Sequence, residues 1–397
     1  MFHVKHILTS ADRNGLAARM PSVRLSKLLI PVILVVAVFS SACVGFSEPR
    51  GWAAPVFDGE TVYVFLDRDE FVAANLDEFG AEWSWTFPDE DLDAEKEIDL
   101  EAVYGPPLFA GDRIILAGFS GEMVALGPEG RYIAGRGSWW RDDVNGSIVG
   151  GATLAGDRFV FGTTEQRLYV RNVVDGGAVA PWPSDGRKLK GEIWSQPVVV
   201  DNIMYVGTMD GNLYAFDLES GQELWTRPFD AGGAIADLAY IGDGVLFVPT
   251  LRGQVWLVDA ETGAALRDPF EAEGWVWTRP VIRDGVAYFG DFEDLVYAWD
   301  MDSGRTLWTY RAENKVKAQG VIIDETLIVG DESGTVHFVD LASGVRRNAV
   351  KLDGAGKIRA GLVEKEGFAW ILGTEGRLYR ADPATLTVIE REVRGLP

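Results

Sequence analysis

The sequence predicts an all-β fold, an eight-bladed β-propeller built from four-stranded antiparallel blades. Two observations carry this prediction. A unit of short strands recurs with a period of about forty residues, and glycine-containing turns separate its strands. The clearest unit, at 204–225, has an Asp-Gly turn, an alternating strand, a Ser-Gly turn and a final strand that ends at Trp225. It returns at 286–308 and at 326–350.

The second hairpin of each unit gives the number of blades. A short strand that ends in Asp, Asn or Gly recurs at 71–75, 123–127, 168–172, 213–217, 255–259, 296–300, 336–340 and 378–382. One blade cannot bury both faces of its sheet, whereas eight blades around an axis bury the faces between neighbours. We therefore expect residues 51–397 to form the propeller. We also expect Trp85, Trp225 and Trp308 to pack between adjacent blades.

Residues 1–42 are predicted to be a signal peptide of the lipoprotein type, with Met20 as an alternative start. A basic segment precedes the apolar run 28–39, which is too short to span a membrane as a stable helix. Small residues then precede Cys43, the only cysteine, in a pattern similar to a bacterial lipobox. We expect cleavage before Cys43, lipid attachment to it, and a short tether at 43–50. Cleavage of an ordinary signal peptide nearby is the alternative.

Composition narrows the classes of function. The formal charge of −23 argues against nucleic-acid binding, which needs basic patches. Of the three histidines, His3 and His6 would leave with the signal peptide, so no zinc site of several His or Cys ligands is expected. His337 occupies a strand position that holds Tyr297 in the preceding repeat, which predicts a structural role. We expect neither catalytic nor metal-binding residues, although a hydrolase that needs only two carboxylates stays open.

The unit at 211–225 resembles the repeat of pyrroloquinoline-quinone-type propellers, and 293–308 matches it again. Eight such repeats behind a lipoprotein signal are similar to the BamB family of outer-membrane assembly lipoproteins, from about residue 51 to the end. The resemblance implies a non-catalytic scaffold, lipid-anchored to the cell envelope and monomeric within a complex. Its partner would be a BamA-like barrel protein where an outer membrane exists, and otherwise another envelope protein.

The same repeat also builds quinoprotein dehydrogenases. Those enzymes usually place a vicinal cysteine pair over the cofactor, and this chain has no cysteine after Cys43. We therefore expect no bound cofactor. A quinoprotein-like oxidoreductase and an extracellular ligand-binding or hydrolytic propeller are the alternatives.

The resemblance also implies a partner-docking segment. In the family, a sequence similar to Leu-x-Leu-Arg-Gly-Glu precedes the start of a blade, and here Leu189, Gly191 and Glu192 match it. Lys190 replaces the arginine, which keeps the charge but loses the bidentate fork, and Arg187 replaces the first leucine. The partner-binding candidates are Arg187, Lys188, Leu189, Lys190 and Glu192. The alternative is a basic hairpin without a partner.

The mouth of the axial channel is a second candidate surface. The first strands of the blades line the channel, so residues at the blade starts face its mouth. Aromatic side chains with a few polar groups around a concavity are typical of ligand and peptide sites. Alternatively, the tryptophans only cap the core between blades. With Tyr104 as a further aromatic residue, the channel-mouth candidates are Trp52, Trp194, Gln196, Asp237, Trp277, Arg279, Lys317, Gln319 and Arg359.

Overall fold

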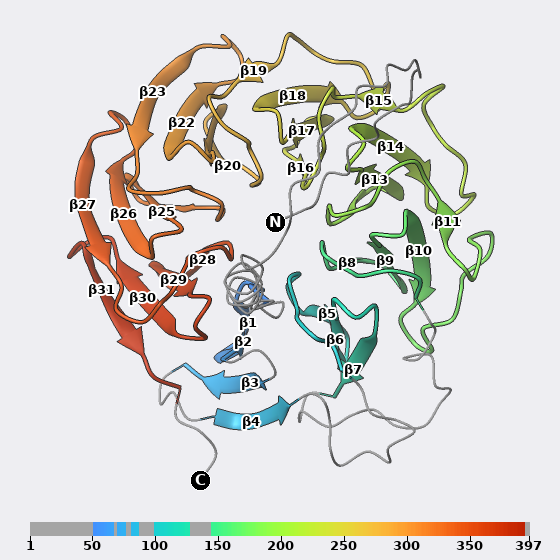
Figure 1. Cartoon of the computed structure of the whole chain (residues 1–397), viewed down its shortest axis with the longest axis horizontal. Helices are drawn as coiled ribbons and strands as arrows, with labels where there is room; N and C mark the ends of the chain where they lie inside the picture. Colours follow the sequence, from blue (N-terminus) through green and yellow to red (C-terminus); the bar gives the residue numbers. More distant parts are fainter. Residues whose placement is uncertain (1–50, 67–69, 77–80, 87–98, 128–143, 394–397) are drawn as a thin grey trace, which may run out of the picture. The chain divides into compact units, whose positions relative to one another are not determined.

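The structure, a computed structural model, describes residues 51–66, 70–76, 81–86, 99–127 and 144–393. Within these ranges, eight antiparallel sheets follow one another around a ring in chain order (Figure 1), which confirms the predicted all-β, eight-bladed propeller. We find no helix in the described residues that is long and apolar enough to cross a membrane. The predicted signal peptide, Cys43 and the tether at 43–50 lie outside the described residues.

Each blade is a meander of consecutive strands. Blades 1 and 2 contain β1 (Val56–Asp58), β2 (Thr61–Phe65), β3 (Glu70–Asn75), β4 (Ala81–Thr86), β5 (Leu108–Ala110), β6 (Arg113–Ala117) and β7 (Met123–Leu126). Blades 3 and 4 contain β8 (Ala152–Ala155), β9 (Arg158–Gly162), β10 (Arg167–Asn172), β11 (Arg187–Lys188), β12 (Val198–Val200), β13 (Ile203–Gly207), β14 (Asn212–Asp217) and β15 (Phe229–Asp230).

The second half of the ring repeats the arrangement. Blades 5 and 6 contain β16 (Ala239–Tyr240), β17 (Val245–Pro249), β18 (Gln254–Asp259), β19 (Phe270–Glu271), β20 (Val281–Arg283), β21 (Val286–Gly290), β22 (Leu295–Asp300) and β23 (Thr306–Arg311). Blades 7 and 8 contain β24 (Val321–Ile323), β25 (Thr326–Gly330), β26 (Thr335–Asp340), β27 (Arg346–Lys351), β28 (Val363–Lys365), β29 (Phe368–Leu372), β30 (Leu378–Asp382) and β31 (Thr387–Arg391). Blade 2 has three strands in the described residues, one fewer than predicted, and residues 128–143 that follow it lie outside them.

The period of two along a middle strand distributes its side chains between two cores. In β14, Tyr214 and Phe216 pack in a cluster with residues of blade 3, such as Val170. Leu213 and Ala215 pack on the other side, in the cluster shared with blade 5. Because successive side chains point to opposite faces and both faces meet a neighbouring blade, the whole centre of the strand is apolar.

Tryptophans at the outer edge join one blade to the next, as the sequence predicts. The indole N–H of Trp225 donates to the carbonyl oxygen of Glu261 at 3.1 Å, and that of Trp308 donates to Leu341 at 3.0 Å. Trp85 is buried among residues of blades 1 and 2. The ring of Trp225 lies against Gly263, where an added Cβ would come within 2.5 Å of the indole. The turn therefore needs glycine for its space as well as for its φ of +70°.

The first and last blades meet by packing. Blade 1 is formed by β1 to β4 and blade 8 by β28 to β31, so in the part of the chain that the structure describes no strand crosses the joint between them. Val62 and Val72 of blade 1 lie in one apolar cluster with Trp370 and Leu378 of blade 8. This apolar contact holds the first and last blades together and keeps the channel mouth a closed ring.

Candidate functional site

The start of each blade contributes one residue to a ring around the channel mouth. In seven blades this residue directly follows a buried valine or isoleucine, namely Val103, Ile148, Ile193, Ile235, Val276, Val316 and Ile358. Successive side chains of an extended segment point in opposite directions. When the valine or isoleucine points into the core between blades, the next side chain therefore points to the channel. These successors line one cavity of about 200 Å³. We call the eight residues the mouth ring: Trp52, Tyr104, Val149, Trp194, Ala236, Trp277, Lys317 and Arg359.

All nine channel-mouth candidates from the sequence line this same cavity. Five of them belong to the mouth ring. The other four are polar residues that follow a ring position by one or two residues: Gln196, Asp237, Arg279 and Gln319. The structure thus brings together residues that lie more than 300 positions apart in the chain, from Trp52 to Arg359. A binding role for them stays a prediction.

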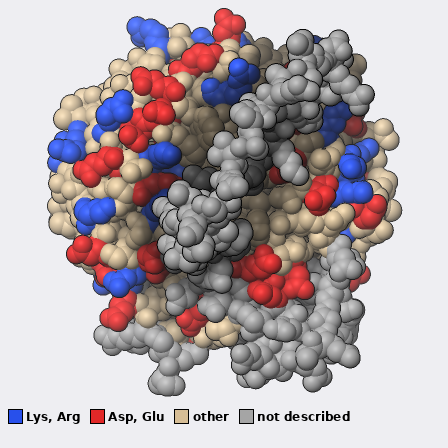
Figure 2. Space-filling model, in the orientation of Figure 1, with Lys and Arg blue, Asp and Glu red and all other residues tan. Residues whose placement is uncertain are grey.

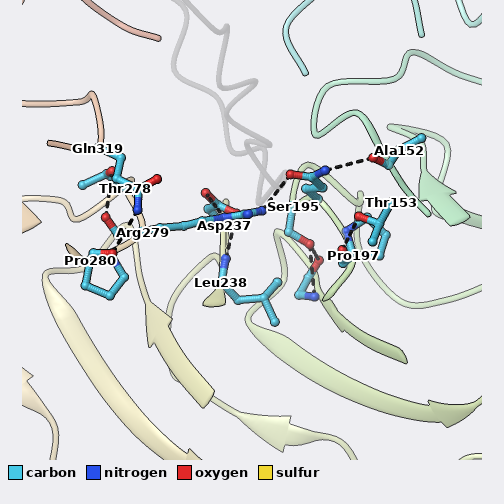
Figure 3. A network of polar contacts seen from close by, with 12 residues as sticks. Ala152, Thr153, Ser195, Pro197, Asp237, Leu238, Thr278, Arg279, Pro280 and Gln319 are labelled. Carbon is cyan, nitrogen blue, oxygen red and sulfur yellow. Dashed lines mark hydrogen bonds and ion pairs between the residues drawn. The ribbon is translucent and has the colours of Figure 1, made fainter. Parts of the chain in front are cut away.

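We call the four polar residues the closed sector, and Arg279 joins two of the others, Asp237 and Gln196, by hydrogen bonds. The Nε of Arg279 donates to both carboxylate oxygens of Asp237, at 2.9 and 3.0 Å (Figure 3). The Nη2 of Arg279 donates to the side-chain oxygen of Gln196 at 3.0 Å. Gln319 donates to the carbonyl oxygen of Pro280 at 3.0 Å. The Arg279 and Asp237 side chains are 29% and 22% exposed, so water in the cavity reaches them only in part.

The closed sector ties blades 3 to 7 to one another at the axis. Gln196 of blade 4 also donates to the carbonyl oxygen of Ala152 in blade 3, at 2.9 Å. Burial raises the pKa of the Asp237 carboxyl above its ordinary value, and the Arg279 guanidinium opposes that rise. Since these bonds cross from blade to blade, this part of the mouth serves first as a structural belt.

A second part of the mouth, which we call the cationic sector, consists of Lys317 and Arg359 with the flanking indoles of Trp52 and Trp277. The ammonium nitrogen of Lys317 lies 4.1 Å from the ring centroid of Trp52 and 3.9 Å from that of Trp277. Lys317 is 9% exposed, and within the described ranges it has no hydrogen bond or ion pair. Burial, helped by the nearby Arg359 charge, lowers its pKa to about 7.

Arg359 continues the cationic sector towards blade 8. Its guanidinium carbon lies 5.2 Å from the ring centroid of Trp52, and its Nε bonds to Glu332 at 2.7 Å. Lys357 also contacts that carboxylate, at 3.4 Å. Burial alone would raise the pKa of Glu332, but the bonds from Arg359 and Lys357 hold it below its ordinary value. Glu332 therefore neutralises only one of the three positive charges around this side of the cavity.

Of the predicted docking segment, two lysines are available to a partner. Lys188 and Lys190 are exposed, whereas Leu189 is 7% exposed and packs in the core between blades 3 and 4. Arg187 lies against the rings of Trp182 and Phe216, at 5.5 and 4.9 Å. Leucine at 189 and arginine at 187 thus stabilise the blade with their side chains.

Glu192 connects the docking segment to the channel mouth. Its carboxylate accepts the indole N–H of Trp194 at 2.7 Å, and the ring of Trp194 lies 6.0 Å from that of Trp277. The two candidate surfaces that the sequence treats separately are therefore neighbours at one rim.

His337 has the structural role that the sequence predicts. Its Nε2 lies 2.9 Å from a carboxylate oxygen of Asp331, and its Nδ1 lies 2.8 Å from the Tyr310 hydroxyl. In the preceding blade the hydroxyl of Tyr297 makes the same contact with Asp291, at 2.8 Å. His337 and Asp331 have no exposed surface, so they lie outside the reach of a substrate. Within the described ranges, no group of three or more His, Cys, Asp and Glu side chains could hold a metal ion.

Sequence reasoning found the mouth residues but not the difference between its two sectors. It also left out Val149 and Ala236 of the ring and the neighbours Glu332 and Lys357. The signal that could separate the sectors is the repeat itself. When the repeats are compared at the ring position, six blades have an aromatic or aliphatic residue there. Lys317 and Arg359 are the two exceptions.

Comparison with known proteins places these features in a family context. The model of a family described as outer membrane protein assembly factor BamB matches residues 133–234 and 209–382. A BamB of Burkholderia pseudomallei is 24% identical over 343 residues, which cover 70% of this chain and 84% of that protein. A BamB of Legionella pneumophila is 25% identical over 174 residues, 40% of this chain and 44% of that protein.

The fold likeness extends to solved structures. The crystal structure of BamB from Moraxella catarrhalis matches with a TM-score of 0.63 over 82% of this chain and 92% of that one. The sequence identity is 17%, so this likeness shows the fold alone.

Proposed function

The chain belongs to the BamB family of outer membrane protein assembly factors, and from this premise we propose that it is a non-catalytic envelope scaffold that binds another envelope protein. The observation that carries the proposal is the family match, which runs from residue 133 to residue 382 and includes blades 3 to 7 and the first three strands of blade 8. Relatives named as assembly factors support the finer role, in outer-membrane protein assembly with a BamA-like barrel protein as the partner.

The geometry of the docking segment supports a contact based on charge. Lys188 and Lys190 project from a chain whose formal charge is −23, so they offer an acidic patch of a partner a local attraction. The apolar contact that the family motif would supply is not available, because Leu189 is buried. We therefore infer that Lys190 carries more of the contact than Leu189 does, and that salt weakens it.

A crosslinked pull-down tests this proposal. The tagged full-length protein is purified from its own membranes after crosslinking, and bound proteins are identified by mass spectrometry. We expect to recover a barrel protein of the BamA type, and Lys190→Glu should lower its yield about tenfold because the charge at the contact is reversed. Arg305→Glu is the matched control, since Arg305 is exposed on the outer turn of blade 6.

The result that would sink the partner proposal is an unchanged yield in Lys190→Glu, or recovery of no envelope protein at all. The control must retain the parental yield, because it introduces the same change of charge far from the docking segment.

We also propose that the chain is lipid-anchored through Cys43. Cys43→Ser removes the acceptor sulfur, so the variant should move from the membrane fraction to the soluble fraction after cell breakage. Unchanged membrane association, together with the mass of an unmodified Cys43 peptide in the parent, would argue against the anchor.

A further inference from the structure

The most unusual group in the mouth is the buried ammonium of Lys317. A buried charge is costly unless it is paired, and the neighbouring closed sector shows how this fold pairs one, with Asp237 against Arg279. Lys317 has no such carboxylate within the described ranges. Its contacts are the two indole faces of Trp52 and Trp277, at 4.1 and 3.9 Å. Indole faces favour the charged form but accept no hydrogen bond along the remaining N–H directions.

Arg359 adds a second set of unused donors beside it. The Nε of Arg359 donates to Glu332, and no described residue accepts a hydrogen bond from the two terminal nitrogens of Arg359. Both cations line the cavity of about 200 Å³, and both lie near the ring of Trp52. The ammonium and the guanidinium that line this one cavity are both donors that bind the oxygens of an anionic group.

We propose that the cationic sector is a binding site for an organic carboxylate, whose charged group lies between Lys317 and Arg359 and whose flat apolar part lies against Trp52 and Trp277. The site is a property of this chain's mouth ring and does not depend on the partner-binding role proposed above. Its two requirements, one negative charge and one apolar face, come from different residues and can be tested separately.

The surroundings favour a carboxylate over a phosphate. The cavity is walled by aromatic rings, which stack on a flat organic group and give nothing to an inorganic ion. Acidic and basic side chains are interspersed on the face shown in Figure 2, and the chain as a whole is strongly acidic, so a dianion meets more repulsion than a monoanion. A volume of about 200 Å³ fits a single aromatic ring with its acid group.

The protonation of Lys317 gives binding a pH dependence with a definite sign. Burial, Arg359 and Lys357 lower the pKa of Lys317 to about 7, while Glu332 opposes that shift. A carboxylate placed against Lys317 favours the ammonium form, so binding near and above neutral pH must take up a proton. Affinity for a carboxylate is therefore highest below about pH 7 and falls as the pH rises beyond the pKa of the free site.

Titration calorimetry with benzoate tests the site in the full-length chain. We expect saturable binding of benzoate, and at least about tenfold weaker binding of benzamide, which has the same shape without the charge. Acetate, which has the charge without the ring, should bind about tenfold more weakly as well. Lys317→Met should lower benzoate affinity at least about tenfold, and Arg359→Gln offers a second removal of charge with a several-fold loss.

Lys315→Gln is the matched control. Lys315 is exposed on the same loop and lies over the ring of Phe292, but it does not line the cavity, so its loss should leave benzoate affinity within about twofold of the parent. The proposal is overturned if benzoate does not bind, if benzamide or acetate binds as well as benzoate, or if the Lys317→Met variant keeps the parental affinity. Thermal unfolding of each variant shows whether it is folded. If Lys317→Met does not fold, the affinity of Arg359→Gln for benzoate decides the test.

Discussion

The two sectors of the channel mouth differ in how they treat a positively charged side chain that lines the same cavity. In the closed sector, Arg279 is bonded to Asp237 and to Gln196, and the bonds cross from blade to blade. In the cationic sector, Lys317 lies between two indoles and makes no ion pair or hydrogen bond among the described residues. The fold thus pairs the cation that follows a ring position by two residues, Arg279, and leaves the ring residue Lys317 without a hydrogen bond or ion pair in the described residues. The contrast separates residues that hold the ring together from a residue kept for a ligand.

Removal of the counter-charge in the closed sector should have the largest effect on stability. Asp237→Asn keeps the size of the side chain but leaves Arg279 without its carboxylate. Because the pair is 29% and 22% exposed, we expect a loss of about 1–3 kcal/mol in the free energy of unfolding, below that of a fully buried pair. Urea unfolding at neutral pH measures this loss.

The same substitution also tests the difference between the two sectors. Without the Asp237 carboxylate, Arg279 becomes a second cation at the mouth without an ion pair. Benzoate affinity should rise several-fold in Asp237→Asn. Asp243→Asn is the control, since Asp243 is exposed in a turn and its loss removes the same charge. A variant as stable as the parent would show that the Arg279–Asp237 pair does not hold the mouth together.

Removal of the unpaired cation should have the opposite, smaller effect. Lys317→Met fills a similar volume and relieves a buried charge, so we expect a gain of roughly 1 kcal/mol or more at about pH 6. The lowered pKa of Lys317 sets the pH window. Below a pH of about 7 the ammonium is charged in the folded protein, and its burial lowers the free energy of unfolding by the full amount. This loss of stability disappears as the pH rises towards 10.5, the pKa of an unburied lysine.

Thermal unfolding at several pH values therefore distinguishes the two proteins. The advantage of Lys317→Met over the parent should be greatest near pH 6 and should shrink by about pH 9. Lys315→Gln should differ from the parent by less than about 0.5 kcal/mol at either pH. An advantage that does not change with pH would mean that the ammonium of Lys317 bears no cost of burial.

Much of this architecture could be predicted from the sequence, for physical reasons. The period of two and the Asp-Gly and Ser-Gly turns are local signals, and they predicted strands such as β14 and β22. The blade-start positions of Gln196 and Lys317 placed both at the mouth because every repeat places its first strand at the axis. The same reasoning predicted a structural His337 from its equivalence to Tyr297.

Other features depend on contacts that no local pattern encodes. Leu189 matches an exposed family motif, yet it is buried, because the short strand β11 turns this side chain into the core between blades 3 and 4. The pairing of Arg279 with Asp237 joins residues 42 positions apart on different blades. The sequence names Asp237, Arg279 and Lys317 as mouth residues without pairing them, and only the fold decides which cation remains unpaired.

The titration of Lys317 by nuclear magnetic resonance, followed at its labelled ε-carbon, tests the central claim most directly. The resonance is assigned by its loss in Lys317→Met, and the titration is repeated with saturating benzoate. We expect Lys317 to titrate with a pKa of about 7 in the free protein and with a higher pKa when benzoate is bound. A lysine that titrates near 10.5 and does not respond to benzoate would contradict it.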